Sequence, residues 1–168
     1  MRICYFGIYN AEYARNKVLI MGLKENNCEV VQCNVDPRKR VGFKKFIKLI
    51  RKYREINNKN FDYMLVGYPG QTVVWLAKLL FRGPIIFDAF FSVYDSLVFD
   101  RKSCKPYSLT GIWNWFLDWY SCSLADTVLL DTNEHIKYFI KEFRIKKVKF
   151  IRILIGADTT IFRPKKYE

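Results

Sequence analysis

Acidic side chains and the single histidine of this sequence come directly after segments that read as buried strands. The acids are Asp88, Asp95, Asp100, Asp131, Glu134 and Asp158, and the histidine is His135. Carboxylates and imidazoles move protons in catalysis, and a polar cleft of this kind can hold sugar hydroxyls. Each acid alone is better explained as a helix cap or a turn residue, and His135 is equally well explained as a surface side chain. Gathered at one edge of a sheet, they would form a polar cleft with Asp88, Asp95, Glu134 and His135 as catalytic candidates.

The sequence disfavours several other kinds of site. With one histidine, a structural zinc site is not expected, and at most one Ser-His-Asp or Cys-His arrangement could exist. The five cysteines are scattered without a CxxC pair, and Cys4 and Cys33 fall in expected strands, where we predict small buried hydrophobes. Gly7 does not open a GxGxxG turn, and no GxxxxGK[ST] loop occurs. We therefore expect neither a cofactor nor a metal ion in this chain.

Apolar segments of two periodicities alternate along the chain. Near-continuous apolar runs predict strands over 2–7, 29–35, 62–67, 84–90, 126–131 and 148–155. Helical spacing predicts helices over 14–27, 41–56, 72–81, 109–125 and 132–143, whereas 92–108 reads as a long loop. Such alternation is typical of a parallel sheet covered on both faces, with right-handed crossovers. We predict an α/β fold, a Rossmann-like doubly wound parallel sheet of about six strands, with ligands at the carboxyl ends of the strands.

The segment FKKFIKLIRKY, residues 43–53, combines an apolar stripe with a dense basic face, and the predicted stripe consists of Phe43, Phe46, Ile47, Ile50 and Tyr53. Residues 37–60 hold ten Lys or Arg and one acid, which is most of the formal net charge of +13. In an ordinary domain such a helix packs its stripe on the sheet, and its basic face is merely solvated. Because this charge density exceeds what solubility needs, we also predict peripheral binding to an anionic membrane. Nucleic acid is the less favoured partner, since no recognition motif supports it.

The segment WNWFLDWY, residues 113–120, places aromatic side chains nearly all the way round a predicted helix. The favoured interpretation is a helix buried between the sheet and a neighbouring loop. The alternative is an aromatic surface at a membrane interface or against a partner domain, because tryptophan suits half-wet sites.

No apolar run in the sequence reaches the roughly 18–20 residues that span a bilayer. The nearest, TVVWLAKLLF, is short and carries Lys78, and the N-terminal segment lacks the form of a signal peptide. We expect a cytoplasmic protein, peripheral on the cytoplasmic face of the membrane.

The stretch RILIGADTTIFRP resembles the segment that joins the two halves of family-4 glycosyltransferases, a strand followed by N-G-V-D-x-x-x-F-x-P. Gly156, Asp158, Phe162 and Pro164 match that segment, whereas Ala157 replaces the valine. MRICYFG, FDYMLVG and PIIFDAF are similar to the family's first, third and fourth strands, in the same order. SLADTVLLDTNEHIKYF resembles its A-D-x-V-x-x-x-S-E stretch. The resemblance covers essentially the whole chain.

This resemblance implies a GT-B architecture, in which two Rossmann-like domains face each other across a cleft. Residues 1–155 would be the acceptor-binding domain, and 156–168 the start of the linker to a donor domain that this sequence lacks. The family's C-terminal domain holds the nucleotide-sugar donor, so this chain alone is expected to have little or no transfer activity. The complete enzyme would move a sugar to a lipid-linked or polysaccharide acceptor, with retention of configuration.

The resemblance also implies roles for residues of this chain. Acceptor-binding candidates near the strand ends are Tyr9, Asn10, Asn16, Tyr68, Gln71, Phe90, Tyr94 and Asp100. Several relatives dock on membranes through a basic amphipathic helix, which makes Phe43, Lys44, Lys45, Phe46, Lys48, Arg51 and Lys52 the membrane-binding candidates. Many relatives carry a histidine after the fourth strand, where this chain has Phe90. Either Asp88 or Asp95 takes over that polar role, or this branch works differently.

Three interpretations stay open. The chain could be half of a longer enzyme, or one part of a split enzyme whose donor domain is a separate subunit. It could also be a non-catalytic adaptor that binds an anionic membrane or nucleic acid.

Overall fold

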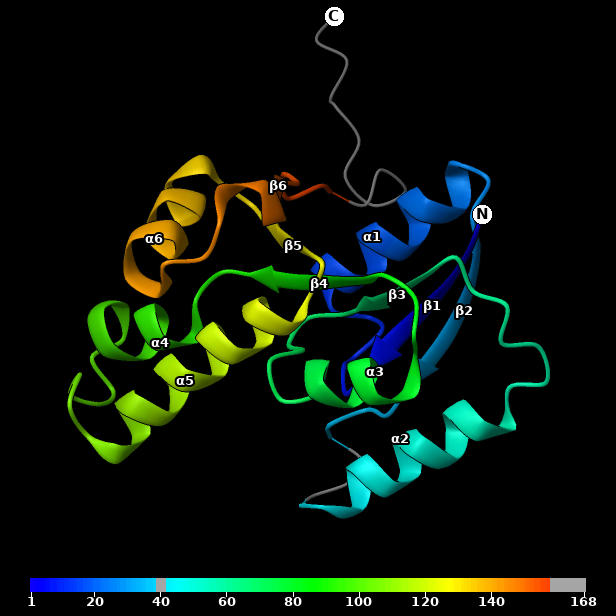
Figure 1. The fold of residues 1–168 in the computed structure, drawn as a ribbon, viewed down its shortest axis with the longest axis horizontal. Helices are drawn as coiled ribbons and strands as arrows, with labels where there is room; N and C mark the ends of the chain where they lie inside the picture. The colour runs from blue at the N-terminus through cyan, green and yellow to red at the C-terminus, as the bar shows by residue number, and fades with distance from the viewer. Residues whose placement is uncertain (39–41, 158–168) are drawn as a thin grey trace, which may run out of the picture.

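The computed structural model describes residues 1–38 and 42–157. Six strands form one all-parallel sheet in the order β2-β1-β3-β4-β5-β6. They are β1 (Arg2–Gly7), β2 (Glu29–Asn34), β3 (Tyr63–Val66), β4 (Ile85–Phe90), β5 (Thr127–Leu130) and β6 (Phe150–Arg152). The chain runs outward from β1 to β2, returns past β1 to β3, and then proceeds strand by strand to β6 (Figure 1). This order confirms the predicted Rossmann-like doubly wound fold.

Helices cover both faces of the sheet. They are α1 (Ala14–Glu25), α2 (Lys44–Glu55), α3 (Val74–Leu80), α4 (Val93–Asp95), α5 (Leu109–Leu124) and α6 (Asn133–Phe143), with a π-helix η1 (Ser96–Asp100) and a 3-10 turn η2 (Lys147–Lys149). Ile20 of α1 packs with Ile3 and Leu65 on one face. Buried residues of α2, α3, α5 and α6 fill a larger core on the other face, among them Leu49 and Phe139. Right-handed crossovers explain this division, because the direction of travel across the sheet reverses after β2.

The expected strands and helices occur close to their predicted limits, with two differences. The sixth strand was expected over 148–155, but only Phe150–Arg152 pairs with β5, because Lys147–Lys149 first make a tight 3-10 turn. The expected loop 92–108 contains α4 and the π-helix, which are too short to leave a helical periodicity in the sequence. The proposed linker start, 156–168, lies outside the described residues except for Gly156 and Ala157.

The buried stripe of α2 is rotated from its predicted position. Leu49 and Tyr53 are buried, and Phe46 and Ile50 pack against them. Phe43 and Ile47 instead remain 71% and 50% exposed. The helix carries apolar side chains over a wide arc, and the sheet covers only part of that arc. An apolar edge therefore lies beside the basic face of α2.

The favoured interpretation of α5, a helix buried between the sheet and a neighbouring loop, is only partly correct, because one side of the helix is exposed. Trp113, Phe116 and Trp119 are exposed on its outer side, where the rings contact one another at centroid distances of 5.8 Å. The inner side carries smaller residues, with Asp118 and Cys122 buried. Small side chains allow α5 to lie close to β4, which leaves the large rings to face outward.

Among the described residues, none of the helices combines the length and the apolar character needed to cross a membrane.

Candidate functional site

The carboxyl ends of the strands bring the candidate residues to one edge of the sheet. The crossover helices after β1 and β3 lie on opposite faces, so the topological switch point, where ligands bind in such folds, falls between these two strands. The segments that follow β1, β3, β4 and β5 all reach this edge. Some of the candidate residues are buried with partners inside the protein, and others remain accessible.

The side chain of Asn16 connects the segments at the switch point through hydrogen bonds. Its Oδ1 accepts hydrogen bonds from the Tyr5 hydroxyl at 3.0 Å and from the Tyr68 backbone N–H at 3.1 Å. Its Nδ2 donates to the carbonyls of Asn10 and Tyr68, at 3.1 and 2.7 Å. Tyr9 is also buried and donates its hydroxyl to the Tyr5 carbonyl. Because their polar groups are satisfied inside the protein, Asn16 and Tyr9 are structural residues rather than the acceptor ligands that we predicted.

Asp88, a predicted catalytic residue, is buried in an ion pair with Arg15. The Arg15 Nη2 lies 2.8 Å from Oδ1 and its Nε lies 3.0 Å from Oδ2. Arg15 also donates from Nη1 to the Ile153 carbonyl at 3.0 Å. Burial raises the pKa of Asp88, and the hydrogen bonds from Arg15 oppose that rise. With no exposed surface, Asp88 has no direct access to a ligand in this structure, so the geometry gives no support to its predicted catalytic role.

Asp118 is a second buried carboxylate, and the sequence interpretation missed it. It accepts hydrogen bonds from the Ser92 hydroxyl at 2.8 Å, from the Tyr94 backbone N–H at 2.9 Å and from the Gln71 amide at 3.4 Å. Burial raises its pKa to about 6. Gln71 and Tyr94, two predicted acceptor ligands, are buried around it. Asp118 was detectable as the only charged residue in the long apolar segment of 109–125.

Four rings form an accessible aromatic cluster at the ends of β3 and β4, namely Tyr13, Tyr68, Phe90 and Phe91. The Tyr68 centroid lies 5.6, 5.2 and 5.4 Å from those of Tyr13, Phe90 and Phe91. Phe90 has a φ of +64°, which is rare for a residue with a bulky side chain. The register between β4 and β5 shifts between Asp88 and Phe90. The backbone is thus distorted where the aromatic cluster meets β5.

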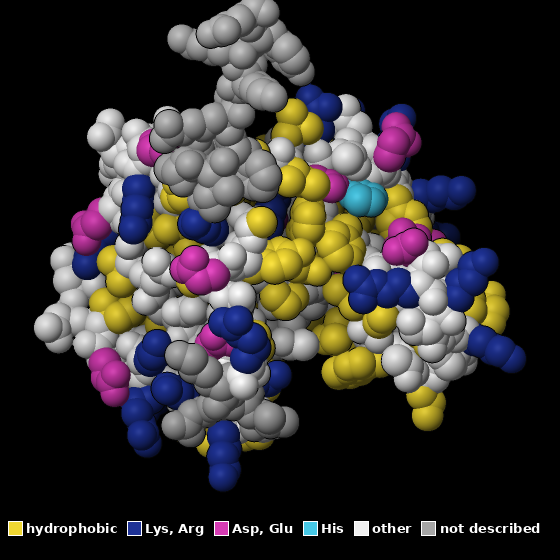
Figure 2. All heavy atoms as spheres, turned by 180° about the vertical axis from the view of Figure 1, so that it is seen from behind, with side chains coloured by type: hydrophobic (Ala, Val, Ile, Leu, Met, Phe, Trp, Pro, Cys, Tyr) yellow, Lys and Arg dark blue, Asp and Glu magenta, His cyan; other side chains and the backbone are white. Residues whose placement is uncertain are grey.

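His135 lies next to this cluster, at the end of β5. Phe90 pairs in register with Leu130, and Asp131 follows directly. The Asp131 Oδ1 lies 2.5 Å from Nδ1 of His135, one helical turn further on. Thr132 caps α6, accepting a hydrogen bond from the His135 backbone N–H at 3.1 Å. In the view from behind, hydrophobic side chains gather across the middle of the face, and the histidine lies at their edge with acidic side chains beside it (Figure 2).

Asp95 belongs to the same site. Burial raises its pKa, and the nearby His135 opposes that rise, which places the two side chains within electrostatic reach of each other. The half-buried ring of His135 therefore contacts Asp131, which follows β5, and is within electrostatic reach of Asp95 of α4. The two acids and His135 form what we call the histidine site.

Among the described residues, the other predicted acids make no hydrogen bond or ion pair with the His135 side chain. Glu134 is highly exposed and contacts Lys137 at 2.7 Å. Asp100 is exposed at the end of the π-helix, and Asp158 lies outside the described residues. Asn10 accepts a hydrogen bond from Arg38 and lines a separate cavity of about 420 Å³ with Lys48 and Lys52. Among the described residues, no group of three His, Cys, Asp or Glu side chains converges as metal ligands.

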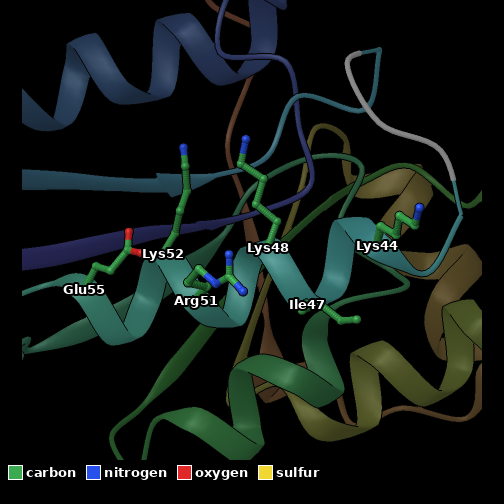
Figure 3. Close-up of a pocket in the computed structure, with 6 residues that line it drawn as sticks. All are labelled: Lys44, Ile47, Lys48, Arg51, Lys52 and Glu55. Carbon is green, nitrogen blue, oxygen red and sulfur yellow. The ribbon is translucent and has the colours of Figure 1, made fainter.

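The basic face of α2 forms a second candidate surface. A shallow groove of about 330 Å³ runs along it, lined by Lys44, Ile47, Lys48, Arg51, Lys52 and Glu55 (Figure 3). Lys52 donates to the Asn34 carbonyl at 2.7 Å and is thereby held to β2. Within residues 1–38 and 42–157, the side-chain cations of Lys44, Lys48 and Arg51 have no partner. These three cations are available to an anionic surface.

The chain matches no protein-family model, and it has no significant similarity to a curated protein.

Proposed function

We propose that this chain is the acceptor-binding domain of a GT-B glycosyltransferase of the family-4 type. The observation that carries the proposal is the aromatic cluster beside the histidine site, at the carboxyl edge of a doubly wound sheet. The aliphatic C–H face of a sugar ring packs on aromatic rings, and its hydroxyls need hydrogen-bonding partners at the rim. Tyr68 and Phe91 supply the first requirement, and the histidine site supplies the second.

The donor side of the reaction would come from a second domain, joined in cis or as a separate subunit. No phosphate-binding glycine motif occurs in this chain. We therefore propose that the nucleotide sugar binds to the partner domain, and that this chain alone transfers little or no sugar. The acceptor would be a lipid-linked or polysaccharide glycan.

Saturation-transfer NMR with methyl glycosides of glucose, galactose, mannose and N-acetylglucosamine tests the proposal on the chain itself. We expect transfer from the protein to ring protons of at least one glycoside. Phe91→Ala should weaken the signal because it removes part of the stacking surface. Tyr107→Ala removes an aromatic ring that is 92% exposed outside the aromatic cluster, and it is the matched control. Absence of binding by every glycoside, or equal loss in both variants, would count against an acceptor site.

A second candidate function is peripheral binding to the cytoplasmic face of an anionic membrane, with or without an enzymatic role. The unpaired cations Lys44, Lys48 and Arg51 and the exposed edge of Phe43 and Ile47 favour it. Near an anionic bilayer, each cation contributes about 1 kcal/mol before screening. The same basic surface could also bind nucleic acid. We favour that ligand less, because the sequence contains no base-reading motif.

Co-sedimentation with phosphatidylserine-containing vesicles at low salt tests this function. A triple variant with Lys44, Lys48 and Arg51 changed to glutamine should bind at least tenfold more weakly. The control changes Lys141, Lys146 and Lys147 to glutamine, because it removes the same charge at the opposite end of the sheet. Equal weakening in both variants would indicate a non-specific charge effect. Vesicle binding without glycoside binding would favour a non-catalytic adaptor.

A further inference from the structure

Three departures from regular backbone geometry surround the histidine site. Phe90 has a left-handed conformation, the pairing of β4 with β5 slips at the same point, and a π-helix begins directly after Asp95. Such features cost free energy, and they gather at functional sites where the geometry of a side chain matters. All three lie in residues 88–100, which include Asp95 of the histidine site.

The ring of His135 is held in one orientation. Thr132 and the first turn of α6 fix its backbone, while the Asp131 carboxylate faces Nδ1. An ionised carboxylate can only accept a hydrogen bond, so the proton of the neutral ring belongs on Nδ1. Nε2 then carries the free lone pair, and within residues 1–38 and 42–157 it has no hydrogen-bond partner. The His135 side chain is 34% exposed, whereas that of Asp131 is 11% exposed, so access to the pair is through the imidazole.

We propose that His135 is the proton acceptor for a hydroxyl of the acceptor sugar, and that Asp131 is the positioning residue that selects its tautomer. This inference rests on the proposed glycosyltransferase function. The hydroxyl O–H bond breaks and an Nε2–H bond forms. The oxygen keeps the electron pair and bonds to the anomeric carbon of the donor on the face from which the phosphate leaves, so that configuration is retained. The bond from that carbon to the phosphate oxygen breaks, with its electrons leaving on the phosphate. The imidazolium is stabilised by its contact with Asp131, and it returns its proton to water.

The other candidates do not meet the same requirements. Asp88 is fully buried and bound to Arg15, and Asp118 is enclosed by its hydrogen-bond donors. Glu134 is accessible but contacts Lys137 at the outer side of α6. Among the histidine and acids at this edge of the described sheet, His135 alone combines an accessible basic atom with a fixed orientation.

The first test uses the fact that the chain has a single histidine. Imidazole ¹⁵N chemical shifts of the wild-type chain, recorded at alkaline pH where the ring is neutral, report which nitrogen carries the proton. We expect protonated Nδ1 and bare Nε2, the less common tautomer of free histidine. Asp131→Asn should lose this preference, whereas Glu134→Gln, which removes a charge from the same turn, should retain it. The wild-type spectrum needs no substitution, so the test survives if Asp131→Asn does not fold.

The second test measures reaction of His135 with diethyl pyrocarbonate, which acylates an unprotonated ring nitrogen. We expect one modified histidine at Nε2, a several-fold slower reaction in Asp131→Asn than in Glu134→Gln, and protection by a methyl glycoside that binds the chain. A proton on Nε2, or equal reactivity in both variants, would overturn the inference. Protection by no glycoside, with the tautomer as expected, would instead count against the glycosyltransferase function on which the inference rests.

Discussion

At the scale of single residues, two carboxylates that face the carboxyl edge of the sheet are structural. Asp118 joins α5 to the segments after β3 and β4, and Asp88 joins β4 to α1. Asp88 could not be assigned from the sequence, because an acid near a strand end looks the same whether it faces solvent or an arginine. Asp118 is conspicuous as the only charged residue of 109–125, but the sequence does not show its partners. What distinguishes them is the partner, and the partners Ser92 and Arg15 are distant in sequence.

The pKa of Asp118, raised by burial to about 6, predicts a specific dependence of stability on pH. A folded-state pKa above the unfolded value means that the folded protein binds the proton more tightly. The stabilisation is therefore complete below pH 4 and is lost as the pH rises through 6. A shift of about two pKa units corresponds to about 3 kcal/mol.

Asp118→Asn removes this dependence. As the pH rises from 4 to 7, we expect the free energy of unfolding of this variant to increase by about 3 kcal/mol relative to that of the wild type. Urea unfolding at several pH values measures the difference. A difference that does not change with pH would show that Asp118 has an ordinary pKa.

The buried pair of Arg15 and Asp88 predicts a strong asymmetry between single and double substitutions. Arg15→Met leaves an uncompensated buried carboxylate and should cost about 3–5 kcal/mol, while Arg15→Met combined with Asp88→Leu should recover most of that loss. Denaturant unfolding of both variants and of Asp88→Leu alone completes the cycle. If the double variant were as unstable as Arg15→Met, the loss would come from Arg15 packing and its bonds to the segment after β6.

At the scale of elements, the sequence predicted which segments are helices and strands better than which helix faces are buried. Six apolar runs gave six strands, because a parallel strand is buried on both faces and its buried side does not have to be identified. For a helix, the side that faces the sheet has to be identified correctly. In α2 the apolar residues extend past the arc that the sheet covers, and in α5 aromatic residues occur all round. The buried side of each helix is determined by contacts with residues that are distant in the sequence.

The rotated stripe of α2 predicts that neighbouring apolar residues have separate effects. Leu49→Ala should destabilise the fold by about 2–5 kcal/mol, because Leu49 is fully buried in the larger core. Phe43→Ser should change stability by no more than about 0.5 kcal/mol. Thermal unfolding and vesicle co-sedimentation, measured on both variants, check the separation: only Phe43→Ser, in its folded form, should weaken vesicle binding. Equal destabilisation by both substitutions would show that Phe43 is buried, as the stripe predicted from the sequence required.

At the scale of the whole molecule, the sheet divides the cysteines into two classes. Cys4, Cys33 and Cys122 are buried, as expected for the first two, whereas Cys28 and Cys104 are partly exposed. Burial raises the pKa of Cys122 well above its ordinary value. In the native protein, we expect iodoacetamide to alkylate Cys28 and Cys104 first and the other three only after unfolding. Mass spectrometry of peptides over time measures the order, and early labelling of Cys122 would contradict the packing of α5 against the sheet.

The contacts of Arg15 also have a consequence for synthesis. Its guanidinium joins α1 to β4 and to the Ile153 carbonyl, which lies 138 residues later in the chain. A ribosome delivers Arg15 long before Ile153, so a nascent chain holds this cation with an incomplete set of acceptors until β6 and the residue after it have been made. Arg15 can therefore complete its hydrogen bonds only when Ile153 has left the exit tunnel. Chains halted before residue 153 should accordingly resist proteolysis less at α1 than chains halted well after it.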